Sequence, residues 1–117
     1  MADDQNQQPQ DQPAAEAPKE EAPAAEEPKT EEAKVLGRQL LRSSSSVASN
    51  YRAVCRSRSK NEFFAKLCIT VEEADESSLW LELIIESGIF DNNEIRTLLK
   101  ESYEITSVLS TARKNTN

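Results

Sequence analysis

The stretch VLGRQLLRSSSSVASNYRAVCRSR, residues 35–58, decides the fold because it contains both an apolar stripe and five arginines. Its apolar side chains recur at intervals of four and seven residues, which predicts an α-helix over about 35–56 with one core-facing side. The serine run 43–46 has low helix propensity, so we expect close packing against a neighbouring helix to compensate for it. The arginines lie outside the stripe. The residues expected to face the core are Leu36, Leu40, Val47, Tyr51 and Cys55, with Leu41, Ala48 and Val54 beside them.

A second helix begins after a short connection. Ser59 and Glu62 have the spacing of a capping box, which predicts a helix over about 60–86. Gly88 follows it as a left-handed stop, because glycine adopts that conformation without steric cost. The side chains expected to be buried on this helix include Phe63, Phe64, Leu67, Val71, Ala74, Leu81 and Ile85.

A third helix is predicted over about 93–113, capped by Asp91, Asn92 or Asn93. Because short connections make successive helices antiparallel, we expect an all-α fold, an up-down antiparallel helical bundle with three legible helices. The apolar stripe of the third helix is Ile95, Leu98, Leu99, Ile105, Val108, Leu109 and Ala112.

Composition divides the 117-residue chain into two parts. Residues 1–34 hold ten of the 21 acidic residues, three of the 14 basic residues and all five prolines, and no apolar residue larger than alanine except Met1. Such a segment cannot bury a core, so we expect a disordered acidic tail over 1–34 and a helical bundle domain over 35–117. The tail reads either as an acidic interaction arm or as a solubilising linker. It shows neither the apolar core of a signal peptide nor the pattern of a transit peptide.

The second helix has more apolar surface than two neighbouring helices readily cover. A domain of this size has a marginal core, so we expect the surplus to form a homo-oligomer interface. The alternative is a wide stripe that is buried within one chain. The predicted interface residues are Leu79, Trp80, Leu83 and Ile84.

Catalysis finds little support in the sequence, and we expect no enzyme activity. The chain has no histidine, the commonest general base and metal ligand. Cys55 and Cys68 have no zinc-ligand spacing, and we expect them to be buried free thiols in a reducing cytoplasm. The acidic residues within 72–76 read as a solvated or salt-bridged face, so no metal or cofactor is expected, and no segment is apolar enough to span a membrane.

Charge is expected to separate along the bundle. In a hairpin that turns near residue 58, Arg42 comes level with Asp75 and Arg38 with Ser78, so Arg42 should be neutralised. One end, here called the basic pole, collects Arg52, Arg56, Arg58, Lys60, Lys66, Arg113 and Lys114 against Glu62. The other end, here called the acidic pole, collects Glu31, Glu32, Glu82, Glu86, Asp91 and Glu94, offset by Lys34 and Arg96.

Several separated motifs resemble one protein family. These are the Gln-Leu-Leu-Arg of 39–42, the Ser-Val-Ala-Ser-Asn of 46–50 and the Arg-Ser-Lys-Asn-Glu-Phe of 58–63, with Glu76 and Gly88 later. Over about 35–112 the chain resembles the four-helix-bundle family of proteins encoded in intervening sequences of bacterial 23S rRNA genes. It departs from the family at Ala53-Val54, where many members have Glu-Gly, and at Glu72-Glu73, where they have Gly-Ser. The first helix of the family should precede Val35, where no helix is legible.

The resemblance implies a function for the basic pole. Relatives of the family include accessory proteins of diversity-generating retroelements, which form pentameric helical barrels and bind reverse transcriptases and nucleic acid. The resemblance therefore implies a homo-oligomer, a pentamer by analogy, that binds RNA or DNA. Basic side chains suit phosphate backbones because binding releases counterions. The alternatives are that the arginines pair with acidic groups of another subunit, or that the chain is a structural scaffold for a protein partner.

Overall fold

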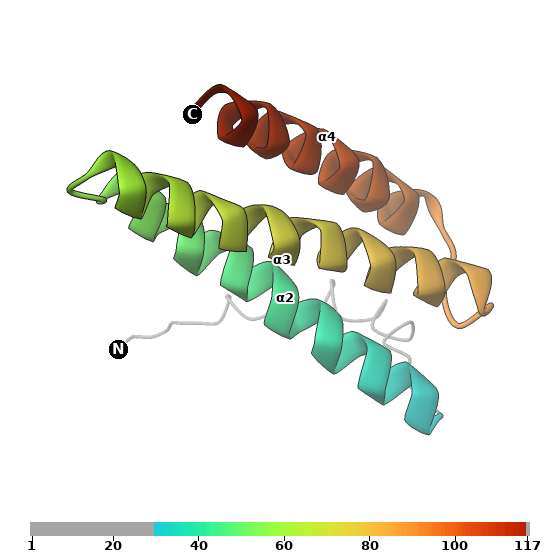
Figure 1. The fold of residues 1–117 in the computed structure, drawn as a ribbon. Helices are drawn as coiled ribbons and strands as arrows, with labels where there is room; N and C mark the ends of the chain where they lie inside the picture. The colour runs from blue at the N-terminus through green and yellow to red at the C-terminus, as the bar shows by residue number, and fades with distance from the viewer. Residues whose placement is uncertain (1–29, 117) are drawn as a thin grey trace, which may run out of the picture.

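The computed structural model describes residues 30–116, which form three helices and no strand. They are α2 (Glu31–Cys55), α3 (Lys60–Glu86) and α4 (Asn93–Thr116), joined by short connections (Figure 1). The predicted all-α, up-down arrangement is confirmed, and the bounds of α3 are those predicted. The expectation of a disordered tail falls largely on residues 1–29, outside the described part of the chain.

Helix α2 begins earlier than the predicted Val35. Thr30 has an extended backbone, and its hydroxyl accepts a hydrogen bond from the backbone N–H of Ala33 at 3.1 Å. Glu31 and Glu32 occupy the first turn, where a carboxylate is favourable next to the unpaired N–H groups of the helix. Four more residues can therefore join the helix before the apolar stripe starts.

The predicted stop and start signals are observed at the other helix ends. Ser59 accepts a hydrogen bond from the backbone N–H of Glu62 at 3.0 Å, and the Glu62 carboxylate accepts one from the backbone N–H of Arg58 at 2.8 Å. Gly88 has a φ of 80°, as a left-handed helix stop requires. Among the three candidate caps of α4, the structure selects Asn92, whose side-chain oxygen accepts from the backbone N–H of Ile95 at 2.9 Å.

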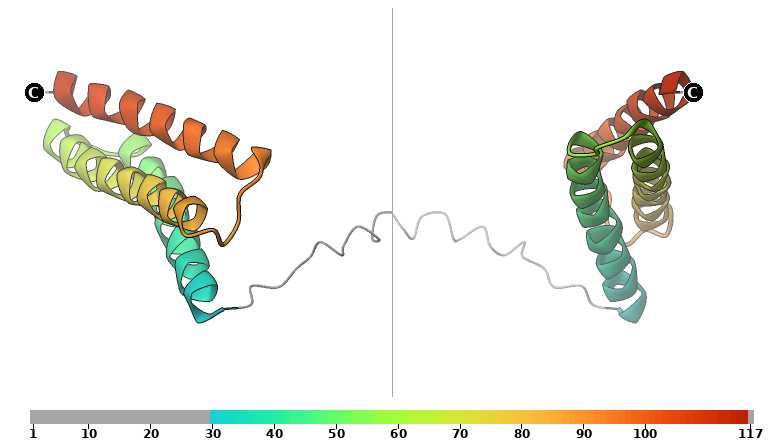
Figure 2. Two further views of the ribbon diagram at one scale, coloured as in Figure 1. Left: turned by 90° about the vertical axis from the view of Figure 1, so that its right-hand side faces the viewer. Right: turned by 60° about the vertical axis from the view of Figure 1, so that its left-hand side comes forward.

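Helix α3 is the centre of the molecule. It packs against α2 along one side and against α4 along another, while no Cα atom of α2 lies within 8 Å of one in α4. Figure 1 shows α2 diverging from α3 toward the N-terminus of α2, and Figure 2 shows the three helices from two further sides. The core has two clusters: Val54, Leu67, Val71, Ala74 and Leu109 toward the 56–59 turn, and Leu81, Ile84 and Ile95 toward the 87–92 turn.

Buried serines set the contacts between the helices. Ser43, fully buried in α2, shares a 2.8 Å hydrogen bond with Ser77 of α3, and the adjacent Ser78 shares another of 2.8 Å with Ser102 of α4. Small side chains let helix backbones approach closely. The expected close packing of the serine run against a neighbouring helix is therefore observed at Ser43. Ser77 and Ser78 of α3 are buried and Ser102 of α4 is half-buried, and the apolar pattern revealed none of these contacts.

Part of the predicted core is exposed. The stripe of α2 is confirmed as buried or half-buried at Leu36, Leu40, Val47 and Val54, but it is wrong at Tyr51, which is 48% exposed. The prediction of buried thiols is wrong for Cys55, which is exposed, whereas Cys68 is half-buried; both are free. The reason is geometric: α3 alone covers α2, so only about one side of the stripe is shielded. The other wrongly predicted core positions are Leu41, Ala48, Leu98, Ile105 and Val108.

Candidate nucleic-acid interface

Three helix ends meet where the basic pole was predicted. The C-terminus of α2, the N-terminus of α3 and the C-terminus of α4 share one core cluster, in which Val54, Phe63 and Ala112 pack together with the buried residues between them. Lys60 of α3 and Thr116 of α4 line one shallow hollow. Figure 1 shows the end of α4 on the same side of the molecule as the 56–59 turn.

The structure places all seven basic side chains on these three helix ends and their connection. Among residues 30–116, only Arg58 of the seven has a carboxylate within 4.0 Å, and its Nε lies 3.8 Å from Glu62. That pair is weak, because the side chain of Arg58 is 87% exposed. The surface therefore presents mostly unneutralised cations. The exposed members of the basic pole are Arg52, Arg56, Arg58, Lys60 and Lys114.

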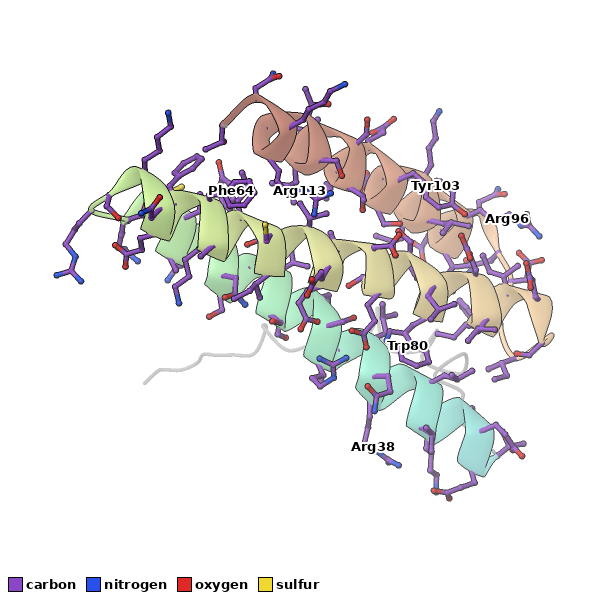
Figure 3. All side chains as sticks on the ribbon, viewed as in Figure 1. Arg38, Phe64, Trp80, Arg96, Tyr103 and Arg113 are labelled. Atoms are coloured by element: carbon purple, nitrogen blue, oxygen red, sulfur yellow. The ribbon has the colours of Figure 1, made fainter. Side chains whose placement is uncertain are left out.

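Lys66 and Arg113 differ from the other five. Both are half-buried. Figure 3 shows the Arg113 side chain in the space between α4 and α3, so its charge contributes to the local potential more than it offers a free contact. The five exposed side chains make up the accessible part of the site.

Arg42 is neutralised as predicted, but by other carboxylates than that of Asp75. Arg42 is neutralised by Glu73, whose carboxylate lies 3.2 Å from its Nη1, and by Glu76. The predicted partner Asp75 is exposed and has no cation within 4.0 Å among residues 30–116, because a matching height along two helices does not fix which side of the helix a residue faces. Glu73 and Glu76 are thereby engaged as a salt-bridged face, the reading preferred for the acidic residues in 72–76. Arg38 pairs weakly with Glu31 at 3.8 Å.

Only part of the predicted oligomer interface is exposed to solvent in the single chain. Ile84 is buried within the chain, in a cluster with Leu81 and Ile95. Trp80 is half-buried between α3 and α2 and donates its indole N–H to Glu76 at 3.1 Å (Figure 3). Leu79 and Leu83 remain exposed. The alternative of a stripe buried within one chain thus holds for Ile84 and in part for Trp80.

The acidic pole has paired groups of its own. Arg96 donates two hydrogen bonds to Asp91, at 2.6 and 2.7 Å, and this contact lowers the pKa of the Asp91 carboxyl. Tyr103 donates to Glu82, and the carboxylate raises the pKa of the Tyr103 hydroxyl. Both shifts keep Asp91 charged and Tyr103 neutral near neutral pH. The acidic end therefore stays acidic.

The remaining chemistry of the described residues is sparse. Within 30–116, no cluster of three or more histidine, cysteine or acidic side chains has the geometry to hold a metal ion. None of the helices in that range combines the length and apolar character needed to cross a membrane. At the basic end, the hydrogen bond with Cys55 raises the pKa of Tyr51, so this exposed phenol is neutral and available for contact.

Two similarities to known proteins bear on this geometry. The sequence model of the 23S rRNA-intervening sequence protein family matches residues 14–111. A crystal structure from Bacteroides thetaiotaomicron VPI-5482, of a protein with unknown function from the S23 ribosomal protein family, has a TM-score of 0.64 and 32% sequence identity. The similarity covers 69% of this chain and 72% of that one. No curated protein matches the chain significantly.

Proposed function

The chain belongs to the 23S rRNA-intervening sequence protein family, and from this premise we propose that it is a non-catalytic helical protein that self-associates and binds RNA backbones through its basic pole. The observation that carries the proposal is the set of five exposed cations on converging helix ends. Among residues 30–116, the one carboxylate within 4.0 Å of any of these five cations is that of Glu62, which lies near Arg58. DNA is the second ligand class for the same contacts.

The chemistry of the site favours phosphate over bases. Exposed guanidinium groups bind phosphate oxygens directly, and each neutralised phosphate releases condensed counterions into solution. Base stacking needs aromatic side chains interleaved with the cations. Tyr51 is the exposed aromatic side chain on the final turns of α2, so affinity should depend on backbone charge and little on sequence.

The absence of catalysis is part of the proposal. The sequence contains no histidine, and the carboxylates of Glu73 and Glu76 are engaged by Arg42 and Trp80. For location we propose a reducing compartment such as the cytoplasm, because Cys55 is both free and exposed and an oxidising compartment would favour its oxidation or pairing.

A second candidate function is a structural scaffold for other proteins. It is supported by large apolar side chains that are exposed to solvent. These include Leu79 and Leu83 on α3, and Ile105 and Val108 on α4. Such surface suits protein association more than nucleic-acid contact.

The test is the salt dependence of binding. Replacing Arg52, Arg56 and Arg58 together with Ala should weaken binding to unrelated RNA sequences about equally, measured by fluorescence anisotropy. The slope of log affinity against log salt should become shallower by roughly 0.7 for each single-strand phosphate contact that is lost, and by roughly 0.9 for duplex DNA.

The matched control is a triple variant in which Lys34, Arg38 and Lys100 are changed to Ala. It removes the same net charge away from the basic pole and should keep most of the slope. The proposal is wrong if both triple variants lose affinity equally, or if the wild-type protein shows no RNA, DNA or heparin binding at low salt. The scaffold function then gains.

A further inference from the structure

An apolar groove lies between α2 and α4, which both pack on α3 and stay apart from each other. Two hollows of about 400 and about 310 Å³ make up this α2–α4 groove, and they are continuous because Val47 and Ile105 line both. The lining extends over residues 40–51 of α2 and 98–109 of α4. At a rise of ~1.5 Å per residue, each wall is about 16 Å long, or about three helical turns.

The floor of the groove is packed within the chain, but its rim is open. Ala74 and Leu81 of α3 form part of the floor and are buried. On the α4 rim, Leu98 is 52% exposed, Ile105 48% and Val108 67%. An apolar surface of this kind is normally covered, because its exposure to water is unfavourable.

The groove corresponds to the place of a fourth helix in an up-down bundle. In such a bundle, the helix diagonal to α3 packs against both α2 and α4 and faces α3 across the core. Among residues 30–116, no helix takes this place. The occupant that fits two helical walls of three turns each is therefore another helix.

The charged side chains that line the groove are both carboxylates. They are those of Glu101 and Glu104 of α4, and both residues are exposed. Among residues 30–116, neither has a lysine or arginine nitrogen within 4.0 Å. An apolar floor bordered by unpaired carboxylates is complementary to a helix that carries large apolar side chains with lysine or arginine beside them.

The chain's own N-terminal segment has neither property. Residues 2–29 contain no apolar residue larger than alanine apart from proline, and they hold eight acidic against two basic residues. Prolines at 13, 18, 23 and 28 also interrupt any helix that the alanines and glutamates favour. Both size and charge therefore make this segment a poor occupant.

The outer side of α3 in a second copy has the wrong charge. This side exposes Leu79 and Leu83. Exposed acidic residues at four or seven positions from Leu79 share the same side of the helix, namely Glu72, Asp75 and Glu86. A second α3 would therefore bring carboxylates to a groove that already has two of its own. The groove side of α4 in a second copy has the same disadvantage, because it carries those two carboxylates itself.

Helix α2 has no second apolar stripe to offer. Outside the groove, its exposed large apolar side chains are those of Val35 and Leu41. These residues are six positions apart, so they lie on different sides of the helix. No helix of the described chain therefore combines a free apolar stripe with basic side chains beside it.

We propose that the α2–α4 groove binds a basic amphipathic helix of a different protein, which supplies the fourth helix of the bundle in trans. The apolar stripe of that helix packs on the α3 floor and against Ile105 and Val108, and its lysine or arginine side chains pair with Glu101 and Glu104. Recognition of this kind uses apolar anchors at intervals of three and four residues along the bound helix. The inference goes beyond the proposed function, and it involves neither the basic pole nor the outer side of α3.

The probe that tests it is a fluorescently labelled synthetic peptide of about 18 residues, or about five helical turns. Leucine takes its apolar heptad positions and lysine the positions beside them, and a matched peptide has glutamate in place of every lysine. At ~150 mM salt, where long-range attraction is screened, the full chain should bind the lysine peptide and not the glutamate peptide. Fluorescence anisotropy measures the binding, and circular dichroism should show that the peptide gains helix when bound.

Charge reversal in the groove tests the site. The double variant Glu101→Lys with Glu104→Lys should reverse the preference and bind the glutamate peptide. The matched control is Glu72→Lys with Asp75→Lys on the outer side of α3. It changes the net charge by the same amount and should keep the preference for the lysine peptide. Because these four side chains are exposed, the helix content of both variants should be unchanged.

A second pair of variants tests the apolar contact. Ile105→Gln with Val108→Gln should weaken binding of the lysine peptide by at least roughly tenfold, because two aliphatic side chains leave the interface. Leu79→Gln with Leu83→Gln is the control on the outer side of α3 and should bind the peptide as the wild type does.

Equal binding of the lysine peptide by the wild type and the Glu101 and Glu104 variant would overturn the inference, because the attraction would then belong to the chain's overall charge. Failure of the wild type to bind either peptide would also overturn it. If the Ile105 and Val108 variant then changed the mass of the assembly in light scattering, the groove would be assigned to a second copy. Peptide binding that appears only after removal of residues 1–29 would assign the groove to the N-terminal segment. None of these outcomes affects RNA binding, which the arginine variants of the basic pole test separately.

Discussion

Ser77 and Ser78, adjacent on α3, each hydrogen-bond to a different neighbouring helix. Ser77 meets Ser43 of α2 and Ser78 meets Ser102 of α4, both at 2.8 Å. Each hydroxyl of the α3 pair also bonds to a backbone carbonyl four residues earlier, so none of these buried polar groups is left unpaired. At the scale of single residues, small hydroxyl side chains therefore set how closely α3 approaches both partners.

A pH-dependent contribution to stability is predicted for the ion pair of Asp91 and Arg96. Because Arg96 lowers the pKa of Asp91 in the folded protein, the pair stabilises the fold above the ordinary aspartate pKa of about 3.9. The contribution is lost as the pH falls through the lowered value. Arg96→Gln should return the Asp91 pKa to its ordinary range, measured by NMR titration of the carboxyl carbon.

The free energy of unfolding should accordingly differ between wild type and Arg96→Gln near pH 6 and converge near pH 2. Lys100→Gln is the control, since it removes one positive charge from α4 and leaves the contact between Arg96 and Asp91 in place. An Asp91 pKa that stays low in Arg96→Gln would assign the shift to another cause.

At the scale of elements, each helix of the described chain has a local reason for its ends. Thr30, Ser59 and Asn92 cap the three N-termini with side-chain oxygens. Gly88, directly after the C-terminal cap of α3, stops that helix with a positive φ. Such signals depend on a few neighbouring residues, so α3 and the start of α4 lie where they were predicted, while the Thr30 cap, which was not predicted, lets α2 begin earlier.

The two glycines should respond in opposite directions to alanine. A Cβ at Gly37 or at Gly88 meets no atom within 4 Å, so only backbone conformation distinguishes them. Gly88→Ala should destabilise the protein by about 1 kcal/mol, because an L-residue is disfavoured at a φ of 80°. Gly37→Ala, within α2, should stabilise it by about 0.5–1 kcal/mol. Urea unfolding measures both, and a shift of the same sign for the two variants would contradict this account.

At the scale of the whole molecule, charge is separated along the helix axes. The basic pole lies where α2 ends, and the acidic pole lies around the 87–92 turn and the start of α2. Residues 1–29 add eight acidic and two basic side chains to a chain whose net charge is −7. Long-range repulsion from this segment should oppose the binding of any polyanion.

Removing residues 1–29 should therefore tighten RNA binding several-fold at ~50 mM salt and matter little at ~300 mM, because the screening length falls below ~10 Å above 0.1 M salt. Anisotropy titrations at several salt concentrations measure this. A full-length variant with the eight acidic residues changed to Asn or Gln separates charge from bulk and should behave like the truncation. Equal affinities of all three proteins at low salt would contradict the electrostatic role of the segment.

The sequence by itself determined the three helices, the Ser59 cap, the Gly88 stop, the family and the order of the cations along the chain, because periodicity, capping and hairpin order are local properties of the chain. Only the tertiary structure decided which faces are covered. It neutralised Arg42 through Glu73 and Glu76 and not Asp75, buried Ile84 within the chain, and left Tyr51, Ile105 and Val108 beside an open groove. An apolar stripe records that a helix side can be buried, but burial also requires a neighbour at the right rotation, and α2 and α4 have α3 alone.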